Sequence, residues 1–155
     1  MTLAHGAGAG MDHVFMVTLS QLLSEQGIAT MRFNFPLPAV AHETIETALA
    51  KAKKLYPGLP LFAAGKSFGG RMTSQYLSAN PDPNIKGLIF YGFPLHPPGK
   101  PSTERAEHLK AVKTPMLFLQ GTKDELATWK LMEATCASLK LATLVKIQGA
   151  NHAFK

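Results

Sequence analysis

Two kinds of hydrophobic pattern follow one another along the chain. Short apolar runs predict buried strands, and longer stretches with apolar residues three and four positions apart predict amphipathic helices. The predicted strands are residues 2–4, 28–35, 61–65, 87–91, 115–120 and 142–147, and the predicted helices are residues 13–26, 43–56, 67–79, 105–110 and 126–139. Strands that alternate with helices predict one α/β domain over residues 1–155, with a mostly parallel sheet and helices on both faces.

Capping residues and apolar spacing define the first helix most clearly. Asp12 is the expected N-cap, and Gly27 is expected to end the helix. The predicted apolar face is broad and comprises Val14, Phe15, Val17, Leu19, Leu22 and Leu23.

The segment Gly65-Lys66-Ser67-Phe68-Gly69 lies between a predicted strand and a predicted helix. Gly-x-Ser-x-Gly in that setting is the nucleophile elbow, a turn so sharp that the serine side chain projects beyond the end of the sheet. Small residues around the serine are a steric requirement, because Cβ atoms there would collide with the neighbouring strand and helix. The motif makes Ser67 a candidate nucleophile.

A serine nucleophile needs a base and an acid that orients the base, and two later loops supply candidates. Asp124 follows the fifth predicted strand and His152 follows the sixth. The carboxyl ends of parallel strands share one edge of the sheet, where ligands bind. Each residue alone is compatible with a turn or surface role, but the order Ser67, Asp124, His152 predicts a catalytic triad.

The glycine-rich loop after the first predicted strand is the candidate for one side of an oxyanion hole. We expect its donor to be the backbone N–H of Ala7, with the N–H of Phe68 as the second donor. Residues expected to border the pocket are His5, Gly6, His13 and His96. For His13 and His96 a surface or loop-stabilising role is an equal alternative. For Arg71 the default is a solvated residue of the first helical turn, and the alternatives are a pair with a carboxylate or a contact with substrate.

Two nucleotide-binding interpretations of the glycine motifs fail on spacing. A phosphate-binding loop requires glycine where Pro60 stands, and the dinucleotide fingerprint requires glycine where Met11 stands. We therefore expect no cofactor. The single cysteine, Cys136, excludes a multi-cysteine zinc site and an internal disulfide, and it is predicted to lie in the core. We also expect no bound metal.

The formal net charge of +6 invites a nucleic-acid interpretation, but the basic residues are scattered and are not interleaved with aromatic residues. We expect no nucleic-acid partner. No apolar run approaches the ~20 residues that a membrane span needs, and the N-terminus lacks a signal-peptide pattern. We expect a soluble, cytoplasmic protein that does not associate with membranes. Within it, Arg32 and Asn34 are candidates for fixing loops beneath the site by hydrogen bonds.

Five stretches of the sequence together resemble one protein family. They are residues 4–10 (AHGAGAG), 32–36 (RFNFP), 65–71 (GKSFGGR), 94–101 (PLHPPGKP) and 120–124 (QGTKD). They resemble the dienelactone-hydrolase-like branch of the α/β-hydrolases, and more narrowly the hydrolase-like domain of testis-expressed and non-specific-lethal-complex subunits and their bacterial relatives. The resemblance implies a three-layer α/β/α-hydrolase fold without a lid and a serine hydrolase that needs no cofactor. Small-molecule, carboxylic-ester-like substrates are implied; dienelactone hydrolases themselves use cysteine in place of Ser67, so their substrate is not carried over.

The resemblance also implies elements that this sequence does not contain. Members of this fold usually carry two strands before the His-Gly loop and a closing helix after the last histidine. We therefore expect a sheet of about six strands, truncated at the N-terminus, with apolar surface exposed at one edge and near the terminus. Three interpretations stay open: a minimal natural version, a truncated gene model, and a homodimer formed through the exposed edge or terminus. The alternative function is a catalytically weak or inactive module that binds a protein partner.

Overall fold

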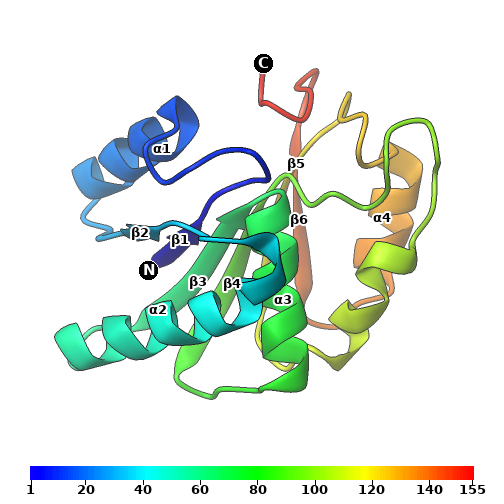
Figure 1. Cartoon of the computed structure of the whole chain (residues 1–155). Helices are drawn as coiled ribbons and strands as arrows, with labels where there is room; N and C mark the ends of the chain where they lie inside the picture. Colours follow the sequence, from blue (N-terminus) through cyan, green and yellow to red (C-terminus); the bar gives the residue numbers. More distant parts are fainter.

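The computed structural model describes all 155 residues and shows a sheet flanked by helices (Figure 1). The strands are β1 (Thr2–Ala4), β2 (Met31–Phe33), β3 (Leu61–Lys66), β4 (Ile85–Tyr91), β5 (Met116–Gly121) and β6 (Ala142–Ile147). The helices are α1 (Val14–Glu25), α2 (Ala41–Leu55), α3 (Phe68–Ala79) and α4 (Trp129–Ala137), with the 3₁₀ helices η1 (Pro38–Val40) and η2 (Glu104–Ala111).

The six strands form one sheet in the order β2-β1-β3-β4-β5-β6, and every neighbouring pair is parallel. This confirms the predicted α/β fold of six strands, which is compact and lidless. Because all strands run the same way, the loops after β1, β3, β4, β5 and β6 meet at one edge of the sheet. None of the helices combines the length and the apolar composition that crossing a membrane requires.

The two faces of the sheet are covered unequally. A cluster of twenty buried residues fills the space between the sheet and α2, α3, η2 and α4. At its centre the rings of Phe90 and Phe118 stack with their centroids 4.4 Å apart, and Phe93 packs edge-on against Phe90. The opposite face carries a cluster of only four buried residues beneath α1, among them Leu3 and Met16. The larger hydrophobic contribution to stability therefore comes from the side of α2 and α3.

The structure corrects two predictions for α1. Its N-cap is His13, whose Nδ1 accepts a hydrogen bond from the Phe15 N–H, and not Asp12. The predicted apolar face is also too broad, because Val14 is 72% exposed and Leu22 is 54% exposed. Met16, which was not assigned to that face, is the one fully buried residue of the helix. A short helix that covers a narrow strip of sheet buries only one row of its side chains. The spacing of apolar residues along the sequence does not show which row that is.

Several element bounds also differ from the predictions. Strand β2 has three residues, because the chain leaves the sheet at Asn34, whose side chain bonds another loop, and Pro36 follows. Helix α4 begins at Trp129, three residues later than predicted. Residues 124–127 first form a turn, in which the N–H of Ala127 donates to the backbone carbonyl oxygen of Asp124 at 3.2 Å. At the β6 edge of the sheet Val145 is 39% exposed, and the apolar surface expected at one edge stays a prediction. Dimerisation there stays a prediction.

The junction of β3 and α3 has no space for side chains at two glycines. A Cβ atom on Gly65 would lie 2.2 Å from the backbone nitrogen of Gly70, and one on Gly69 would lie 2.5 Å from the carbonyl oxygen of His5. Real Cβ atoms do not approach backbone this closely. Both positions therefore require glycine, as predicted for the motif. The atoms that an added Cβ would meet belong to the backbone, so they cannot move aside as the end of a side chain could.

We expect Gly69→Ala to lower the free energy of unfolding by about 3 kcal/mol, since the methyl group must displace the backbone of the neighbouring loop. Gly58→Ala is the matched control, because no atom lies within 4 Å of the added Cβ. Its free energy of unfolding should stay within about 0.5 kcal/mol of the wild type. Urea unfolding followed by circular dichroism measures both, and equal stability of the two variants would contradict the packing described here.

Candidate active site

Ser67 occupies a strained turn between β3 and α3. It is the N-cap of α3, with φ 50° and ψ −117°, and it is one of only two non-glycine residues with positive φ. Its backbone N–H donates to the carbonyl oxygen of Tyr91 at 3.2 Å, which ties the turn to the end of β4. Such backbone strain costs of order 1–3 kcal/mol and persists only where surrounding contacts enforce it. The turn directs the Ser67 side chain to the edge where the strands end.

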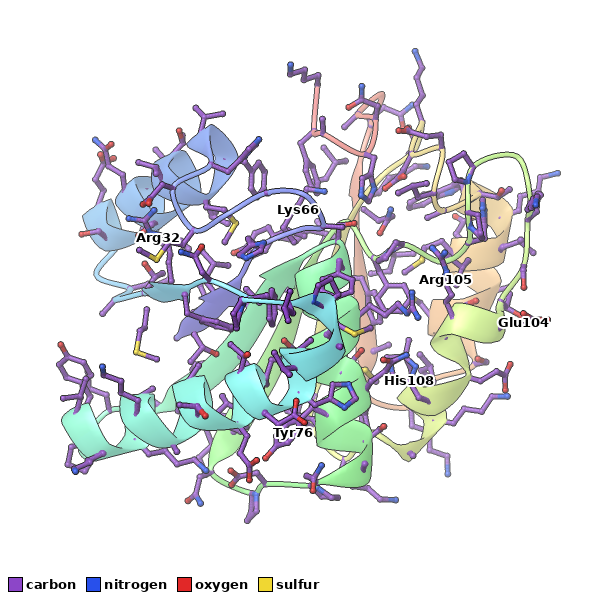
Figure 2. All side chains as sticks on the ribbon, viewed as in Figure 1. Arg32, Lys66, Tyr76, Glu104, Arg105 and His108 are labelled. Carbon is purple, nitrogen blue, oxygen red and sulfur yellow. The ribbon has the colours of Figure 1, made fainter.

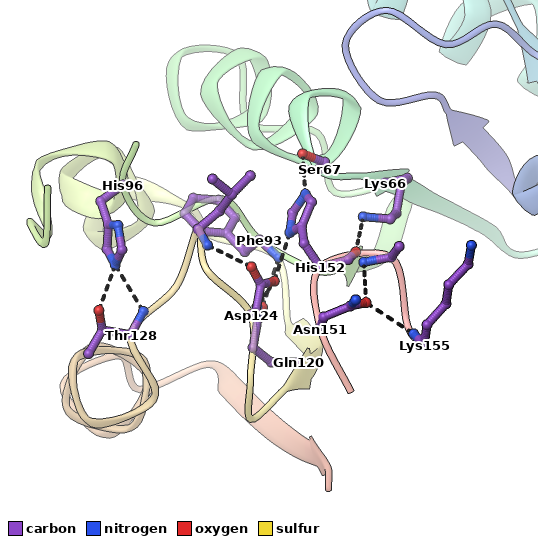
Figure 3. A network of polar contacts seen from close by, with 12 residues as sticks. Lys66, Ser67, Phe93, His96, Gln120, Asp124, Thr128, Asn151, His152 and Lys155 are labelled. Carbon is purple, nitrogen blue, oxygen red and sulfur yellow. Dashed lines mark hydrogen bonds and ion pairs between the residues drawn. The ribbon is translucent and has the colours of Figure 1, made fainter. Parts of the chain in front are cut away.

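Ser67, His152 and Asp124 form a continuous hydrogen-bonded chain across that edge (Figure 3). The Ser67 Oγ lies 2.8 Å from His152 Nε2, and His152 Nδ1 lies 2.7 Å from Asp124 Oδ2. An ionised carboxylate only accepts, so Nδ1 carries the proton and, in the neutral ring, Nε2 accepts from the serine hydroxyl. The structure thus brings together the three side chains that the sequence singled out.

Asp124 is buried, and its oxygens are fully engaged. Gln120 Nε2 donates to Oδ2 at 2.6 Å, and the N–H of Leu126 donates to Oδ1 at 2.8 Å. Gln120 is itself inaccessible to solvent, and its Oε1 accepts from the Phe93 N–H at 2.8 Å. These contacts fix the carboxylate in one orientation toward His152. Gln120 is not among the site residues predicted from the sequence, although it lies four positions before Asp124.

Lys66 holds the backbone of the His152 loop. Its Nζ donates to the carbonyl oxygen of His152 at 2.8 Å, and it lies 5.8 Å from the Phe15 ring centroid and 5.4 Å from that of Phe154. Burial lowers the pKa of Lys66 to about 8, although Asp124 acts in the opposite direction. This role of Lys66 is not predictable from the motif, because the position between Gly65 and Ser67 accepts any residue in the elbow.

The residues after His152 close into a turn around Asn151. The Asn151 side chain accepts hydrogen bonds from the N–H groups of Ala153 and Lys155, at 3.0 and 3.1 Å. The ring of Phe154 stacks on that of Phe15 in α1, with the centroids 5.8 Å apart. The loop that carries His152 is therefore anchored both to β3 through Lys66 and to α1 through an aromatic contact.

The loop after β1 exposes a free donor at Ala7. Ala7 is exposed, and its backbone N–H has no acceptor within the protein. Phe68 is the first residue of α3, where N–H groups lack intrahelical acceptors. His5 is buried; its Nε2 accepts from the Phe35 N–H at 3.1 Å, and its Nδ1 contacts the carbonyl oxygen of Gly6 at 2.8 Å. His5 thus fixes the backbone of the loop that Gly6 and Ala7 belong to.

Both backbone polar groups of Met11 form hydrogen bonds with side chains at the edge of the sheet. Arg32 donates to the Met11 carbonyl oxygen, and the Asn34 side chain accepts from the Met11 N–H at 2.8 Å. This confirms the expectation that Arg32 and Asn34 fix a loop near the site by hydrogen bonds.

Two histidines that were expected to border the pocket have structural contacts instead. His13 is exposed at the start of α1, where it caps the helix. His96 is buried; its Nε2 accepts from the Thr128 N–H at 2.9 Å, and its Nδ1 contacts the Pro97 carbonyl oxygen at 2.8 Å (Figure 3). Neither ring contacts Ser67, Asp124 or His152. His96 also lines a surface depression with Lys100 and Arg105, so a place for it at the border of a pocket stays a prediction.

Other reactive groups in the protein lack the surroundings that Ser67 has in its hydrogen-bonded chain with His152 and Asp124. Ser74 Oγ lies 2.7 Å from His108 Nε2, but Ser74 is fully buried and no carboxylate bonds to His108. Burial and the positive charge of Arg71 lower the pKa of His108 to about 4. Cys136 lies in the core as predicted, and burial raises its pKa to about 12. No three His, Cys, Asp or Glu side chains are grouped in a way that would hold a metal ion.

The family model described as alpha/beta hydrolase domain matches residues 1–155. The chain belongs to the α/β-hydrolase family. Solved structures with the same fold include an α/β serine hydrolase homologue from Coxiella burnetii, with 21% identity and a TM-score of 0.77 over 98% of this chain and 76% of that one. Est1E from Butyrivibrio proteoclasticus, solved with ferulic acid, has 19% identity and a TM-score of 0.78 over 99% of this chain and 81% of its own.

A third structure similar to this α/β-hydrolase is a serine hydrolase without a lid from Xanthomonas campestris. It shares 21% identity with this chain, and the TM-score is 0.76 over 99% of this chain and 73% of that one. At these identities the likeness shows the fold, and the chemistry of this α/β-hydrolase depends on its own residues.

The lowered pKa of Lys66 predicts a pH dependence of stability. Between about 8 and the ordinary value of 10.5 the unfolded chain binds a proton at Lys66 that the folded protein does not. The contribution of Lys66 to the free energy of unfolding therefore rises as the pH increases through this window. Lys66→Met lacks this contribution, so we expect its Tm to fall relative to that of the wild type between about pH 7.5 and about pH 10.

Parallel thermal melts of the wild type and both variants by circular dichroism measure the effect. Lys130→Met, which removes an exposed lysine of α4, is the control and should keep a constant Tm difference from the wild type. A Tm difference for Lys66→Met that does not change with pH would show that Lys66 is not buried as a cation.

Proposed function

We propose that this protein is a small, lidless serine hydrolase of carboxylic-ester-like substrates. The observation that carries the proposal is the unbroken hydrogen-bonded chain from Ser67 Oγ through the His152 ring to Asp124 Oδ2, with distances of 2.8 and 2.7 Å. In this proposal Ser67 is the nucleophile, His152 the general base and then the general acid, and Asp124 the residue that orients His152. No cofactor takes part.

The acylation step follows from the direction of these hydrogen bonds. Ser67 Oγ attacks the ester carbonyl carbon while its proton moves to His152 Nε2. The resulting imidazolium is stabilised by the buried Asp124 carboxylate, which Gln120 holds in place. Collapse of the tetrahedral intermediate breaks the bond to the alcohol, which leaves with the proton from His152. An acyl-enzyme on Ser67 remains.

Deacylation repeats the sequence with water. His152 takes a proton from water, the hydroxide attacks the acyl carbon, and the proton returns to Ser67 as the carboxylic acid is released. The negative oxygen in both steps needs donors that are already in place. We assign the N–H groups of Ala7 and Phe68 to this role, because the first has no acceptor in the protein and the second belongs to the first turn of α3.

A fluorophosphonate probe tests the proposal directly, since it phosphonylates an activated serine with loss of fluoride. We expect the wild type to be labelled, and labelling to disappear in Ser67→Ala and in His152→Ala. Ser78→Ala is the matched control, because Ser78 belongs to the same helix but bonds only to the Gln75 carbonyl oxygen. Mass spectrometry of the intact protein measures labelling as one added phosphonyl group.

The probe also separates the two functions. Absence of labelling in the folded wild type, or labelling that persists in Ser67→Ala, would overturn the proposal. A folded protein without a reactive serine would instead favour the hydrolase-like module that binds a protein partner.

Asp124→Asn is expected to lower kcat for p-nitrophenyl acetate on the order of 10³–10⁴-fold, since an amide no longer stabilises the imidazolium. KM should change little, because Asp124 is buried behind His152. Asp82→Asn controls for the loss of one negative charge, because Asp82 pairs with Lys53 and has no contact with Ser67 or His152. Steady-state kinetics decides, and a variant that keeps more than about a tenth of the wild-type kcat would refute the role of Asp124.

A further inference from the structure

Two of the three arginines in the protein have no partner. Arg32 bonds to the Met11 carbonyl oxygen and lies 3.7 Å from an Asp12 oxygen. Arg71 and Arg105 make no side-chain hydrogen bond, no ion pair and no cation–π contact, although both are half-buried. A guanidinium carries five N–H donors and is always charged, so a half-buried one without an acceptor is unusual.

The absence of a partner is most marked at Arg71. Its Nε is shielded from solvent and has no hydrogen-bond partner, and it is the only such buried side-chain atom in the protein. An unpaired buried donor costs on the order of 1–3 kcal/mol, more when the group is charged. Burial, together with the positive charge of Arg105, lowers the pKa of Arg71. The hydrogen bond of 2.7 Å between Ser74 of α3 and His108 of η2 shows that the two helices are in contact three residues after each arginine.

Helix geometry places Arg71 beside the nucleophile. The Arg71 N–H donates to the Ser67 carbonyl oxygen at 3.1 Å, so Arg71 lies one turn after Ser67 on the same side of α3. Side chains on a helix lean toward its N-terminus, which for Arg71 is the end that carries Ser67. Four residues of helix span about 6 Å, so the backbones of Arg71 and Ser67 are about one turn apart.

Helix η2 supplies the second arginine from the opposite side. Figure 2 shows Arg105 and His108 on the part of η2 that lies beside α3. Arg105 also lines a surface depression of about 390 Å³, together with Lys100 and Glu104. Glu104 is the one carboxylate among the lining residues, and it forms no ion pair with Arg105. Arg71 is not among the residues that line this depression, and neither Arg71 nor Arg105 forms an ion pair with a carboxylate of the protein.

We propose that Arg71 and Arg105 form a subsite for an anionic group, a carboxylate or a phosphate, on the substrate that Ser67 attacks. The subsite deepens the proposed function, on which its connection to catalysis rests. An anion between the two guanidinium groups accepts hydrogen bonds from both and removes their mutual repulsion. The substrates favoured by this arrangement are esters whose acyl part carries an acidic group a few carbon atoms from the carbonyl.

Binding is tested without turnover in Ser67→Ala. Succinate and inorganic phosphate are titrated at constant ionic strength, with chloride as the reference anion, and the Tm is followed by differential scanning fluorimetry. We expect a saturable rise in Tm with at least one of the two anions. The rise should disappear when Arg71→Gln or Arg105→Gln is added and remain when Lys113→Gln, an exposed lysine after η2, is added instead.

Selectivity is tested with two esters of the same phenol, one a neutral butyrate and one a glutarate monoester. We expect kcat/KM to favour the glutarate monoester in the wild type, and the preference to fall about tenfold or more in Arg71→Gln and Arg105→Gln, since each removes charged hydrogen bonds. The ratio of the two substrates is the measured quantity, so a general loss of activity from poor folding does not imitate the effect. Lys113→Gln should retain the wild-type ratio.

The outcomes separate the subsite from the proposed function. Arginine-dependent anion binding without hydrolysis of either ester would support the subsite and count against the hydrolase. Hydrolysis of both esters with no anion-dependent rise in Tm and no preference that depends on the arginines would overturn the subsite and leave the hydrolase standing. A Tm rise of equal size in all variants would also overturn it, because binding would then not involve these arginines.

Discussion

The first turn of α3 lies against β1 and β3 with no room for a side chain between them, and the candidate site depends on that contact. Gly65 and Gly69 are the residues that permit it. The contact forces Ser67 into a positive φ and directs its side chain to the edge where the strands end. The same contact places Arg71 one turn below the serine and aligns the loop after β1 with the start of the helix. A single steric constraint thus positions both Ser67 and its surroundings.

The groups around His152 solve a different problem, the alignment of a residue that lies on a loop. Asp124 orients the ring, and Gln120 orients Asp124 through contacts that are inaccessible to solvent. Lys66 holds the backbone of the loop by its carbonyl oxygen. Burying a cation there is unfavourable, and the low pKa of Lys66 is the signature of that burial. The ammonium group thus combines anchoring of the loop with a positive charge close to the ring that Asp124 orients.

The sequence was sufficient for the fold and for the three side chains of the hydrogen-bonded chain, because both follow from topology. Ser67, Asp124 and His152 each come directly after a strand, and parallel strands bring such positions to one edge. Gln120 and Lys66 could not be recognised this way: Lys66 bonds to a residue 86 positions away, and the bond from Gln120 to nearby Asp124 depends on side-chain orientation, which the topology does not determine. The face of α1 was predicted wrongly for a related reason: periodicity shows which residues share a side, but not how much sheet lies beneath them.

The long sequence separations within the site have a consequence for how the protein folds. Ser67 and His152 are 85 residues apart, and β1 lies between β2 and β3, so its neighbours are synthesised after it. Parallel sheets with such distant pairings close large loops before native contacts compensate for the lost chain entropy, and they fold slowly. During synthesis on the ribosome the contacts of the Ser67 turn can assemble once β4 has emerged, whereas His152 follows the final strand. The hydrogen-bonded chain of Ser67, His152 and Asp124 is therefore completed last, when almost the entire hydrophobic core is already in place.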